Sequence, residues 1–227
     1  MILWLVLNVG LLIGAYLLGS IPTGYMAGRL LKGIDIRTFG SGSTGATNVL
    51  RTVGKGPALL VLLVDILKGA AAIALVKWTY YLEITSTLAP PPVIENWFFW
   101  MITGVALAAI LGHSKSIWLN FTGGKSVATS LGVVLAMSWP VGLATLGVFA
   151  TVIAISRIVS LSSITAAIAL PAIMLAIHQP LPYVLFGIAG GIYVIWRHRS
   201  NIDRLLAGTE PRVGQKIAPQ PEQSTSG

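Results

Sequence analysis

The sequence contains no cysteine, and it is poor in acidic residues, with seven Asp and Glu against fifteen Lys and Arg. Without cysteine, the chain has no disulfide, no thiol nucleophile and no cysteine-ligated metal site. The three histidines, His113, His178 and His198, stand far apart in the sequence, so we expect no metal centre and no cofactor. The basic residues are scattered through short segments and not gathered on one helix or strand, which argues against a nucleic-acid partner.

Charged residues of both signs make up only 10% of the 227 residues, whereas a soluble domain carries about 25%. Hydrophobic residues make up 55%, and the mean hydropathy is +0.81. These values indicate an integral membrane protein. Several apolar runs approach or exceed the roughly 20 residues that cross a bilayer as a helix. We expect seven spans, at 2–24, 57–77, 97–112, 126–138, 140–156, 161–178 and 181–196.

The distribution of basic residues sets the expected orientation. With seven spans and the N-terminus outside, most Lys and Arg residues fall in segments that face the cytoplasm, as the positive-inside rule requires. Merging 126–138 with 140–156 would spoil this bias, and Pro140 offers a break between them. The sequence therefore predicts an all-α integral membrane protein with seven transmembrane helices, N-terminus outside and C-terminus cytoplasmic. Residues 1–205 would form a single polytopic membrane domain, and residues 206–227 a flexible cytoplasmic tail.

The first polar stretch, residues 40–51, reads Gly-Ser-Gly-Ser-Thr-Gly-Ala-Thr-Asn-Val-Leu-Arg. Glycines allow the backbone to turn its N–H groups inward, hydroxyl groups add short donors, and Arg51 adds a fixed cation. This combination suits the binding of a phosphate group. Although Gly40, Gly42 and Gly45 match the spacing of a dinucleotide fingerprint, no strand precedes them, so that match is chance. The alternative explanation is an ordinary polar loop between two spans.

The second polar stretch, residues 112–126, ends in Gly123-Gly124-Lys125-Ser126. The two glycines allow a close approach to a ligand, and Lys125 would lie at the start of the next span, where free N–H groups favour an anion. The stretch is not a Walker A motif, because Leu119 stands where that motif requires glycine. The alternative is that the lysines here only fix membrane topology.

The third polar cluster, residues 197–204, follows the last apolar run. His198 and Asn201 are three residues apart and share a face if the helix continues. His198 could act as a general base or as a phosphate donor. His198 and Asp203 also fit the His-x-x-x-x-Asp pattern that occurs in glycerolipid acyltransferases, but they would point about 140° apart on a continuous helix. The alternative is an arginine-rich collar that contacts anionic lipid.

Two further groups of polar residues accompany these stretches. Arg157, Ser160 and Ser163 lie in a short turn between two predicted spans. Asp65 and Lys68 lie three residues apart within a predicted span, where charged side chains are costly unless paired or functional. We interpret them as a structural pair that braces the helix bundle, with a role in substrate binding as the alternative.

Taken together, these motifs resemble the bacterial acyl-phosphate:glycerol-3-phosphate acyltransferases, the PlsY family. The similarity follows the chain in order through residues 19–24, 41–51, 65–69, 112–113, 121–125, 157–163 and 198–202. The resemblance implies transfer of a fatty acyl group from acyl phosphate to the 1-hydroxyl of glycerol 3-phosphate. The products would be lysophosphatidic acid and phosphate, in the first step of phospholipid synthesis, by direct transfer without an acyl-enzyme or a metal.

The resemblance also implies which residues form the site. His198, Lys125 and Arg51 would be the catalytic residues. The substrate phosphates would be bound by Ser41, Gly42, Gly45, Thr47, Asn48, Arg51, Gly123, Gly124, Lys125, Ser163, His198 and Asn201. His113, Arg157, Ser160, Asp65 and Lys68 would support them. The chain departs from the family where Ser43-Thr44 replaces the usual Asn-Pro, a change that bears on substrate affinity.

The expected partners are acyl phosphate, glycerol 3-phosphate and the lipid bilayer, with a monomer as the expected state. The expected location is the inner membrane, with the active site on its cytoplasmic face. A transporter of a phosphorylated small solute is the rival hypothesis. Against it, the sequence shows no internal repeat, and its polar residues gather at one membrane face instead of the midplane. Acyl-CoA remains open as the acyl donor.

Overall fold

The computed structural model describes residues 1–215 of the chain. Within these residues the chain is helical throughout, and an isolated bridge between Ser116 and Thr122 is its only β-type pairing. The elements are α1 Ile2–Ser20, α2 Thr23–Lys32, η1 Ile36–Thr38, α3 Ala46–Thr52, α4 Lys55–Tyr81, α5 Glu83–Leu88, α6 Pro91–Ser114, η2 Ile117–Leu119, α7 Val127–Met137, α8 Trp139–Ser156, α9 Val159–Ala176, α10 Leu181–Arg197 and α11 Arg199–Leu206. The expected all-α architecture is confirmed for this part of the chain.

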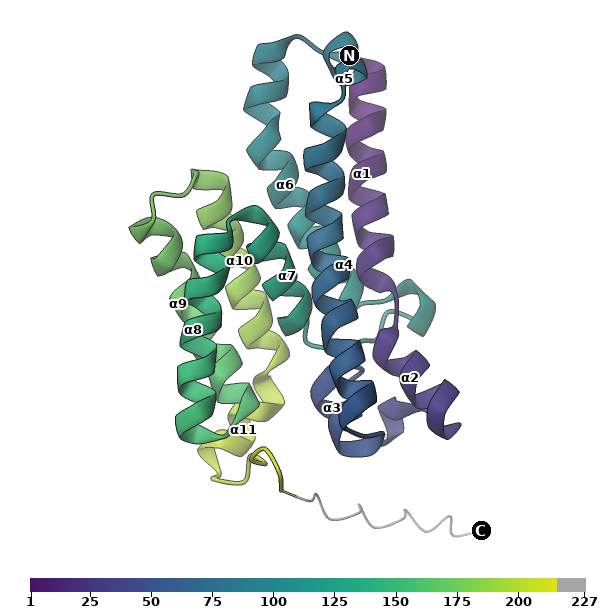
Figure 1. The fold of residues 1–227 in the computed structure, drawn as a ribbon, viewed down its shortest axis with the longest axis vertical. Coiled ribbons are helices and arrows are strands. Elements are labelled where there is room, and N and C mark those ends of the chain that lie inside the picture. The colour runs from purple at the N-terminus through teal and green to yellow at the C-terminus, as the bar shows by residue number, and fades with distance from the viewer. Residues whose placement is uncertain (216–227) are drawn as a thin grey trace.

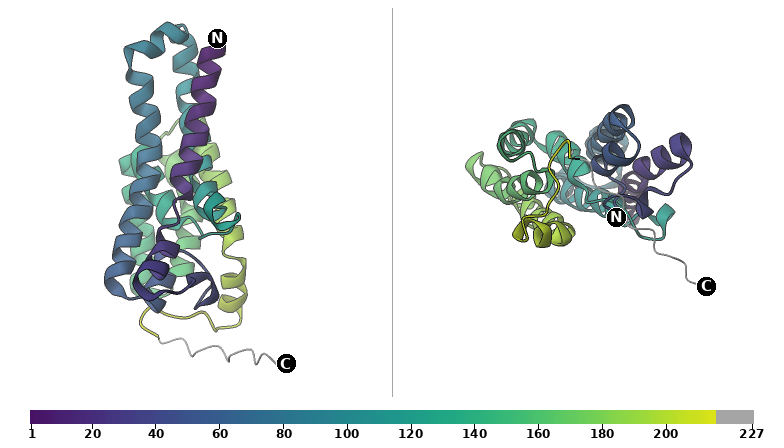
Figure 2. Two further views of the ribbon diagram at one scale, coloured as in Figure 1. Left: turned by 90° about the vertical axis from the view of Figure 1, so that its right-hand side faces the viewer. Right: turned by 90° about the horizontal axis from the view of Figure 1, so that it is seen from below.

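The long helices fall into two groups. Figures 1 and 2 show α1, α4 and α6 side by side as the taller group, with α7 to α10 as a shorter group beside it. Helices α4 and α7 pack against each other and join the two groups. The short helices α2, α3 and α11 all lie at the end of the molecule opposite the N-terminus (Figure 1). The polar residues 40–51 and 197–204 lie toward that end, and residues 112–126 contact the latter through the bonds of Lys125 to Asn201 and of Arg197 to Gly123.

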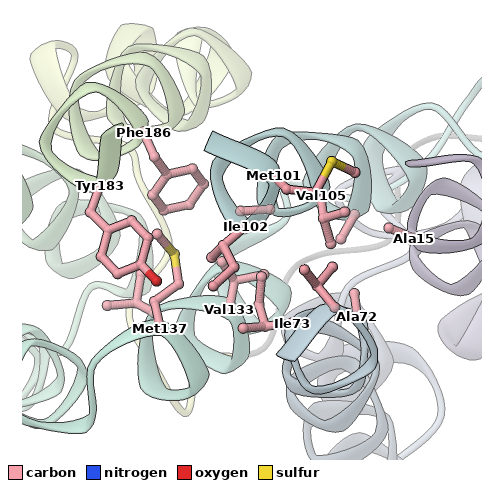
Figure 3. Close-up of a cluster of buried hydrophobic side chains, with 14 of the residues drawn as sticks. Ala15, Ala72, Ile73, Met101, Ile102, Val105, Val133, Met137, Tyr183 and Phe186 are labelled. Carbon is pink, nitrogen blue, oxygen red and sulfur yellow. The ribbon is translucent and has the colours of Figure 1, made fainter. Parts of the chain in front are cut away.

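A core of apolar side chains lies within the taller group and continues to where the two groups meet. Figure 3 shows Ile73 of α4, Ile102 of α6, Val133 of α7 and Phe186 of α10 pointing toward one another. All four side chains are buried. Many leucines on the outer faces of the same helices are exposed instead, for example Leu67 of α4. Apolar residues on both the inner and the outer faces are typical of helices that contact lipid.

The contact between α4 and α7 depends on glycine. A β-carbon added at Gly132 of α7 would lie 1.9 Å from the carbonyl oxygen of Ile66, and one added at Gly69 of α4 would lie 2.3 Å from the carbonyl oxygen of Thr129. Both positions therefore exclude any larger residue unless the helices move apart. Small residues of this kind let helix backbones approach closely in a membrane, where van der Waals packing is a main source of helix association.

Five helical segments in the described part of the chain are long and apolar enough to cross a membrane. They are residues 2–32, with α1 and α2 counted together, 55–81, 91–114, 139–156 and 159–176. Helices α7 and α10 are also apolar but have only 11 and 17 residues. The count of seven spans and the orientation of the termini therefore stay predictions.

The predicted spans can be compared with the observed helices at two proline residues, and they differ at the first. The run at 2–24 is not one helix, because α1 ends at Ser20 and α2 begins at Thr23. Pro22 explains this break, since a proline disfavours helix in the residue before it. The break expected near Pro140 is present, with α7 ending at Met137 and α8 starting at Trp139.

The expected tail, residues 206–227, is described only in part. Residues 216–227 lie outside the described residues, so their predicted flexibility is untested. Before them, the chain turns back toward the bundle, where the backbone N–H of Val213 donates to the carbonyl oxygen of Arg157 at 2.7 Å. The side chain of Glu210 in this returning segment is only 4% exposed. The first part of the expected tail therefore contacts the turn between α8 and α9.

Candidate functional site

A cavity of about 640 Å³ is lined by residues of both helix groups and of all three polar stretches. One part of its lining is polar and includes Arg51, Lys125, Ser163, His198 and Asn201. The remaining lining is mostly apolar and comes mainly from α4 and α7 to α10. Its large apolar side chains include Leu59, Leu62, Leu131, Leu146, Phe149, Leu170 and Phe186. The cavity therefore offers a charged end and an apolar arm to a single ligand.

A smaller and mainly polar cavity of about 190 Å³ adjoins the charged end. It is lined by Ser41, Gly42, Ser43, Gly123, Lys125, Arg197, Arg199 and Ser200. Ser41, Ser43 and Lys125 line both cavities. A polar ligand in the smaller cavity would thus contact residues that also line the larger one.

The first polar stretch is held in shape by Asn48, which lies on α3 and is 1% exposed. Its side-chain Nδ2 donates to the carbonyl oxygens of Ile36, Phe39 and Ser43 at 2.9 to 3.1 Å. Its Oδ1 accepts the backbone N–H of Ser41 at 3.0 Å. These bonds engage the whole side-chain amide of Asn48 inside the loop. Asn48 therefore closes the loop, and it also lines the cavity.

Glycine and Ser43 complete the loop geometry. Gly40 and Gly42 have φ values of 58° and 67°, a region that favours glycine. The Ser43 hydroxyl accepts the backbone N–H of Gly45 at 3.3 Å. Ser43, which stands where the resemblance leads us to expect Asn, therefore bonds within the loop. Arg51 follows on α3, and its guanidinium is half-buried, which lowers its pKa below the usual value.

The second polar stretch is held against the ends of α6 and α10. A β-carbon at Gly124 would lie 2.2 Å from Nε2 of His113, so a larger residue there would displace the buried His113 ring. The backbone N–H of Gly124 donates to the carbonyl oxygen of His113 at 3.2 Å. Arg197 donates to the carbonyl oxygens of Gly123 and Gly124 at 3.1 and 2.9 Å. These contacts fix the backbone on which Lys125 stands.

Lys125 points from this loop into the charged end of the large cavity, where its Nζ donates to Oδ1 of Asn201. Burial lowers the pKa of Lys125 to about 8, and the carboxylate of Glu210 partly opposes the shift. Arg204, Arg197 and Arg51 lower the pKa further. Lys125 is therefore charged at neutral pH but loses its proton far more readily than an exposed lysine.

His198 lies at the junction of α10 and α11. Its Nδ1 is 2.7 Å from the carbonyl oxygen of Val194, and since a carbonyl can only accept, Nδ1 carries the hydrogen. Burial lowers the pKa of His198 to about 4, although that carbonyl opposes the shift. The ring is thus neutral near pH 7, with Nε2 free to accept a hydrogen bond. Within the described residues, His198 forms no hydrogen bond or ion pair with Asp203.

The N-terminal end of α9 supplies two hydroxyl groups to the cavity lining, from Ser160 and Ser163. These two residues therefore belong to a helix and not to the turn expected from the sequence. The Ser163 hydroxyl donates to the carbonyl oxygen of Val159 at 2.8 Å. This bond within α9 fixes the orientation of the hydroxyl group and of its lone pairs. The Ser160 hydroxyl donates to Oε1 of Glu210 at 2.7 Å. Arg157 adopts a left-handed conformation, with φ 60°, that ends α8.

A buried charged cluster supports the site from the side of α4. Oδ1 of Asp65 lies 2.8 Å from Nζ of Lys68 and accepts a hydrogen bond from the Thr23 hydroxyl at 2.7 Å. Nδ1 of His113 lies 3.5 Å from the same oxygen, and Nζ of Lys68 also donates to the carbonyl oxygen of Ile21 at 2.9 Å. The expected Asp65–Lys68 pair is present, and it ties together α1, α2, α4 and α6.

Most of the predicted site residues come together at the two cavities. The large cavity is lined by Ser41, Gly45, Thr47, Asn48, Arg51, Asp65, His113, Lys125, Ser160, Ser163, His198 and Asn201. Gly42 and Gly123 line only the smaller one. Gly124, Arg157 and Lys68 line neither and act through their contacts with His113, Val213 and Asp65.

Sequence reasoning missed several residues of the site, among them Arg197 and Arg199 at the smaller cavity and Glu210, which lines the large cavity. Glu210 is the one acidic residue among these three. It lies in the segment that we expected to be a tail. Two signals could have found it. Acidic residues are scarce in this chain, and Glu210 follows a cluster of arginines that a carboxylate would balance.

Comparisons with known proteins agree with this arrangement. A family profile described as Glycerol-3-phosphate acyltransferase matches residues 9–208. The Glycerol-3-phosphate acyltransferase of Trichormus variabilis is 64% identical over 223 residues, which cover 98% of this chain and 99% of that protein. The chain is also similar to two crystal structures of PlsY (YgiH), an integral membrane glycerol 3-phosphate acyltransferase.

In its glycerol 3-phosphate form, that protein is 38% identical, with a TM-score of 0.79 and coverage of 91% of this chain and 96% of the other. In its lysophosphatidic acid form, the TM-score is 0.77, with 38% identity and coverage of 91% and 95%. The similarity therefore extends over nearly the whole of both chains. With its apolar helices, it supports a multi-pass membrane protein.

Proposed function

The chain belongs to the glycerol-3-phosphate acyltransferase family, the PlsY family, and on that premise we propose that it transfers a fatty acyl group to the 1-hydroxyl of glycerol 3-phosphate. The donor in this proposal is an acyl phosphate, and the products are lysophosphatidic acid and inorganic phosphate. The two PlsY crystal structures, in glycerol 3-phosphate and lysophosphatidic acid forms, support both the acceptor and the product.

The observation that carries the proposal is the division of the large cavity into a cationic end and an apolar arm. Arg51 and Lys125 lie among its polar lining residues, and the remaining lining is mostly apolar, with several leucine and phenylalanine side chains. An acyl phosphate has the same two parts, a charged head and a long apolar chain. The adjoining polar cavity, which shares Lys125, suits a small and strongly charged acceptor such as glycerol 3-phosphate.

The proposed reaction is a direct transfer. The 1-hydroxyl oxygen attacks the acyl carbon, and the bond from that carbon to the phosphate oxygen breaks with its electron pair going to phosphate. Because acyl phosphate is a mixed anhydride, it arrives activated, and the protein needs mainly to align the reactants and stabilise negative charge. Arg51 and Lys125 supply the positive charge. No acyl-enzyme and no metal is needed in this scheme.

His198 orients the attacking hydroxyl in this proposal. Its neutral ring presents Nε2 as an acceptor to the cavity. With a pKa of about 4, His198 is a weaker base than a phosphate monoester, whose second pKa is about 6. The hydroxyl proton therefore goes to a substrate phosphate, and His198 holds the hydroxyl in place. The rival hypothesis, in which His198 takes the proton, is tested in the Discussion.

We further propose the seven-span topology, with the N-terminus outside and the site at the cytoplasmic face of the inner membrane. Arg51 lies on α3, one of the short helices at the end of the molecule opposite the N-terminus, and Lys125 lies in the loop before α7. The positive-inside rule places such basic segments in the cytoplasm, where glycerol 3-phosphate is available. A monomer suffices, because the residues of one chain line both cavities.

The decisive experiment uses the purified protein in detergent with palmitoyl phosphate and glycerol 3-phosphate, without added metal or nucleotide. Release of phosphate and formation of lysophosphatidic acid are measured together, with Lys125→Ala as the control variant. We expect equal amounts of both products, and loss of both in the variant. Turnover with palmitoyl-CoA but not palmitoyl phosphate would refute the donor. No turnover from folded protein would favour the transporter, which uptake into proteoliposomes would then measure.

A further inference from the structure

Glu210 lies beyond α11, where the chain reverses direction. Gly208 has a φ of 69°, and the backbone N–H of Thr209 donates to the carbonyl oxygen of Arg204 at 2.8 Å. The returning chain places the Glu210 side chain at the cavity wall, next to the turn between α8 and α9. The position of this carboxylate therefore depends on the loop that follows α11.

Both oxygens of the Glu210 carboxylate are hydrogen-bonded. Oε1 accepts from the Ser160 hydroxyl at 2.7 Å and from Nδ2 of Asn201 at 2.6 Å. Oε2 accepts from Nε of Arg204 at 2.7 Å. Although burial opposes ionisation, these hydrogen bonds keep the pKa of Glu210 below its usual value. The side chain is therefore an anion that can only accept hydrogen bonds.

This acceptor fixes the direction of the Asn201 amide. The amide has one donating end and one accepting end, and a flip exchanges them. Glu210 accepts a hydrogen bond from Nδ2, the donating end of the amide. Oδ1 of Asn201 is therefore turned toward Lys125, whose Nζ donates to it. If the amide flipped, two donors would face each other at Lys125 and two acceptors at Glu210. The chain of contacts thus runs from Glu210 through Asn201 to Lys125.

We propose that Glu210 is a positioning residue of the acyltransferase site, which acts through Asn201 to hold Lys125 at the phosphate-binding end of the cavity. This inference rests on the proposed function for its kinetic consequences. It does not make Glu210 a ligand of either substrate, since its oxygens are occupied by protein donors and its charge would repel a phosphate.

Glu210 also acts on Lys125 through its charge. The charged groups that face Lys125 come from several elements: Arg51 on α3, Arg197 on α10, Arg204 on α11 and Glu210 after it. The three arginines lower the pKa of Lys125 and Glu210 raises it. Neutralising Glu210 should therefore make Lys125 lose its proton at a lower pH.

The test is a double-mutant cycle on Glu210 and Asn201, with the KM for glycerol 3-phosphate and the phosphate-releasing kcat as readouts. We expect Glu210→Ala to raise KM about tenfold, because a hydrogen bond to a charged group is lost. We expect Asn201→Ala to raise KM at least as much, and the double variant to be no worse than Asn201→Ala alone. Effects that multiply in the double variant would overturn the proposal.

Arg204→Gln is the matched control. It breaks the ion pair with Glu210 but leaves the bonds to Ser160 and Asn201, so we expect a KM within about twofold of the wild type. Glu210→Gln tests the charge alone, and we expect the alkaline limb of its kcat/KM profile to move to lower pH. A merely structural role would leave that limb in place. A fall in KM in Glu210→Ala would also refute the proposal, since the carboxylate would then be competing with substrate phosphate.

Folding and function are separated by two further measurements. Thermal unfolding in detergent shows whether each variant folds; if Glu210→Ala does not, Glu210→Asp replaces it in the cycle. Binding of inorganic phosphate, measured by the shift in unfolding temperature, tests Glu210 even if no turnover occurs. A wild type that binds phosphate without turnover would refute only the proposed function. Equal phosphate binding by wild type and Glu210→Ala would refute the role of Glu210.

Discussion

In the proposed reaction, Lys125 must carry a positive charge to bind phosphate. Its buried surroundings favour the neutral form. Burial lowers its pKa to about 8, and only its protonated form attracts phosphate. Raising the pH through this value removes the charge, so we expect kcat/KM for glycerol 3-phosphate to fall by about tenfold for each further pH unit. The measurement is the pH profile of kcat/KM, which reports the free protein.

Lys125→Arg provides the control for this prediction, because a guanidinium keeps its charge across the whole range. We expect the variant to lose rate, since its shape differs, but also to lose the fall near pH 8. If the fall stays near pH 8 in Lys125→Arg, another group causes it and the assignment is wrong.

His198→Gln separates the two roles considered for His198. If His198 only orients the hydroxyl, a glutamine carbonyl can replace Nε2 as acceptor, and we expect a raised KM with kcat reduced less than about tenfold. If His198 takes the proton, kcat should fall by about 10² to 10⁴. Steady-state kinetics with palmitoyl phosphate at pH 7 distinguish the outcomes, with Asp203→Asn as a control that lies outside the cavity.

The sequence indicates some of these residues and conceals others for physical reasons. Arg51 and Lys125 stand out because they are cations inside runs of glycine and hydroxyl residues. The role of Asn48 is hidden, because its partners Ile36 and Phe39 are backbone carbonyls that only the folded loop brings near. Glu210 is hidden as well, since nothing local to it shows that the chain returns to the bundle.

At the scale of helices, the contact between α4 and α7 sets the width of the cavity that both helices line. A β-carbon at Gly132 would meet the Ile66 carbonyl at 1.9 Å, so we expect Gly132→Ala to destabilise the protein by ~1–3 kcal/mol through overpacking. Activity should fall with it, because the helices must shift. Thermal unfolding in detergent and turnover measure the two effects.

Gly147 on α8 is the matched control, because an added β-carbon there meets nothing within 4 Å. We expect Gly147→Ala to be neutral or to stabilise by up to ~1 kcal/mol, as alanine favours helix. Equal effects of the two substitutions would show that helix propensity, and not the close contact, governs both positions.

Some of the helices could be predicted from the sequence, and others could not. Long apolar runs indicate α4, α6, α8 and α9 because lipid requires length and hydrophobicity, and both are visible in sequence. The short helices α2, α3 and α11 carry no such signal. Helix α3, for example, has seven residues and depends on packing against α4. Short helices are marginal alone, so tertiary contacts decide where they form.

At the scale of the whole molecule, the buried Asp65–Lys68 pair joins α4 to α1, α2 and α6 through Thr23, Ile21 and His113. Removing one member leaves the other as an unpaired buried charge, so we expect Lys68→Met or Asp65→Asn alone to cost ~3–5 kcal/mol. We expect the double variant to be more stable than the Lys68→Met single variant. The measurement is thermal unfolding in detergent.

Lys115→Met is the control for this prediction, since that lysine forms no ion pair within residues 1–215. It should leave the unfolding temperature almost unchanged. A double variant that is as unstable as the sum of the two single variants would mean that the two charges do not depend on each other.

The unequal height of the two helix groups has a consequence for the surrounding lipid. Helix α4, with 27 residues, is about 40 Å long at 1.5 Å per residue, whereas α9, with 18, is about 27 Å. Next to the shorter group, the hydrocarbon layer of about 30 Å must become thinner to match the apolar surface. The leaflet beside α7 to α10 thus brings lipid headgroups closer to the membrane centre. In the proposed reaction, an acyl donor carried in that leaflet would lie near the depth of its binding residues before it enters.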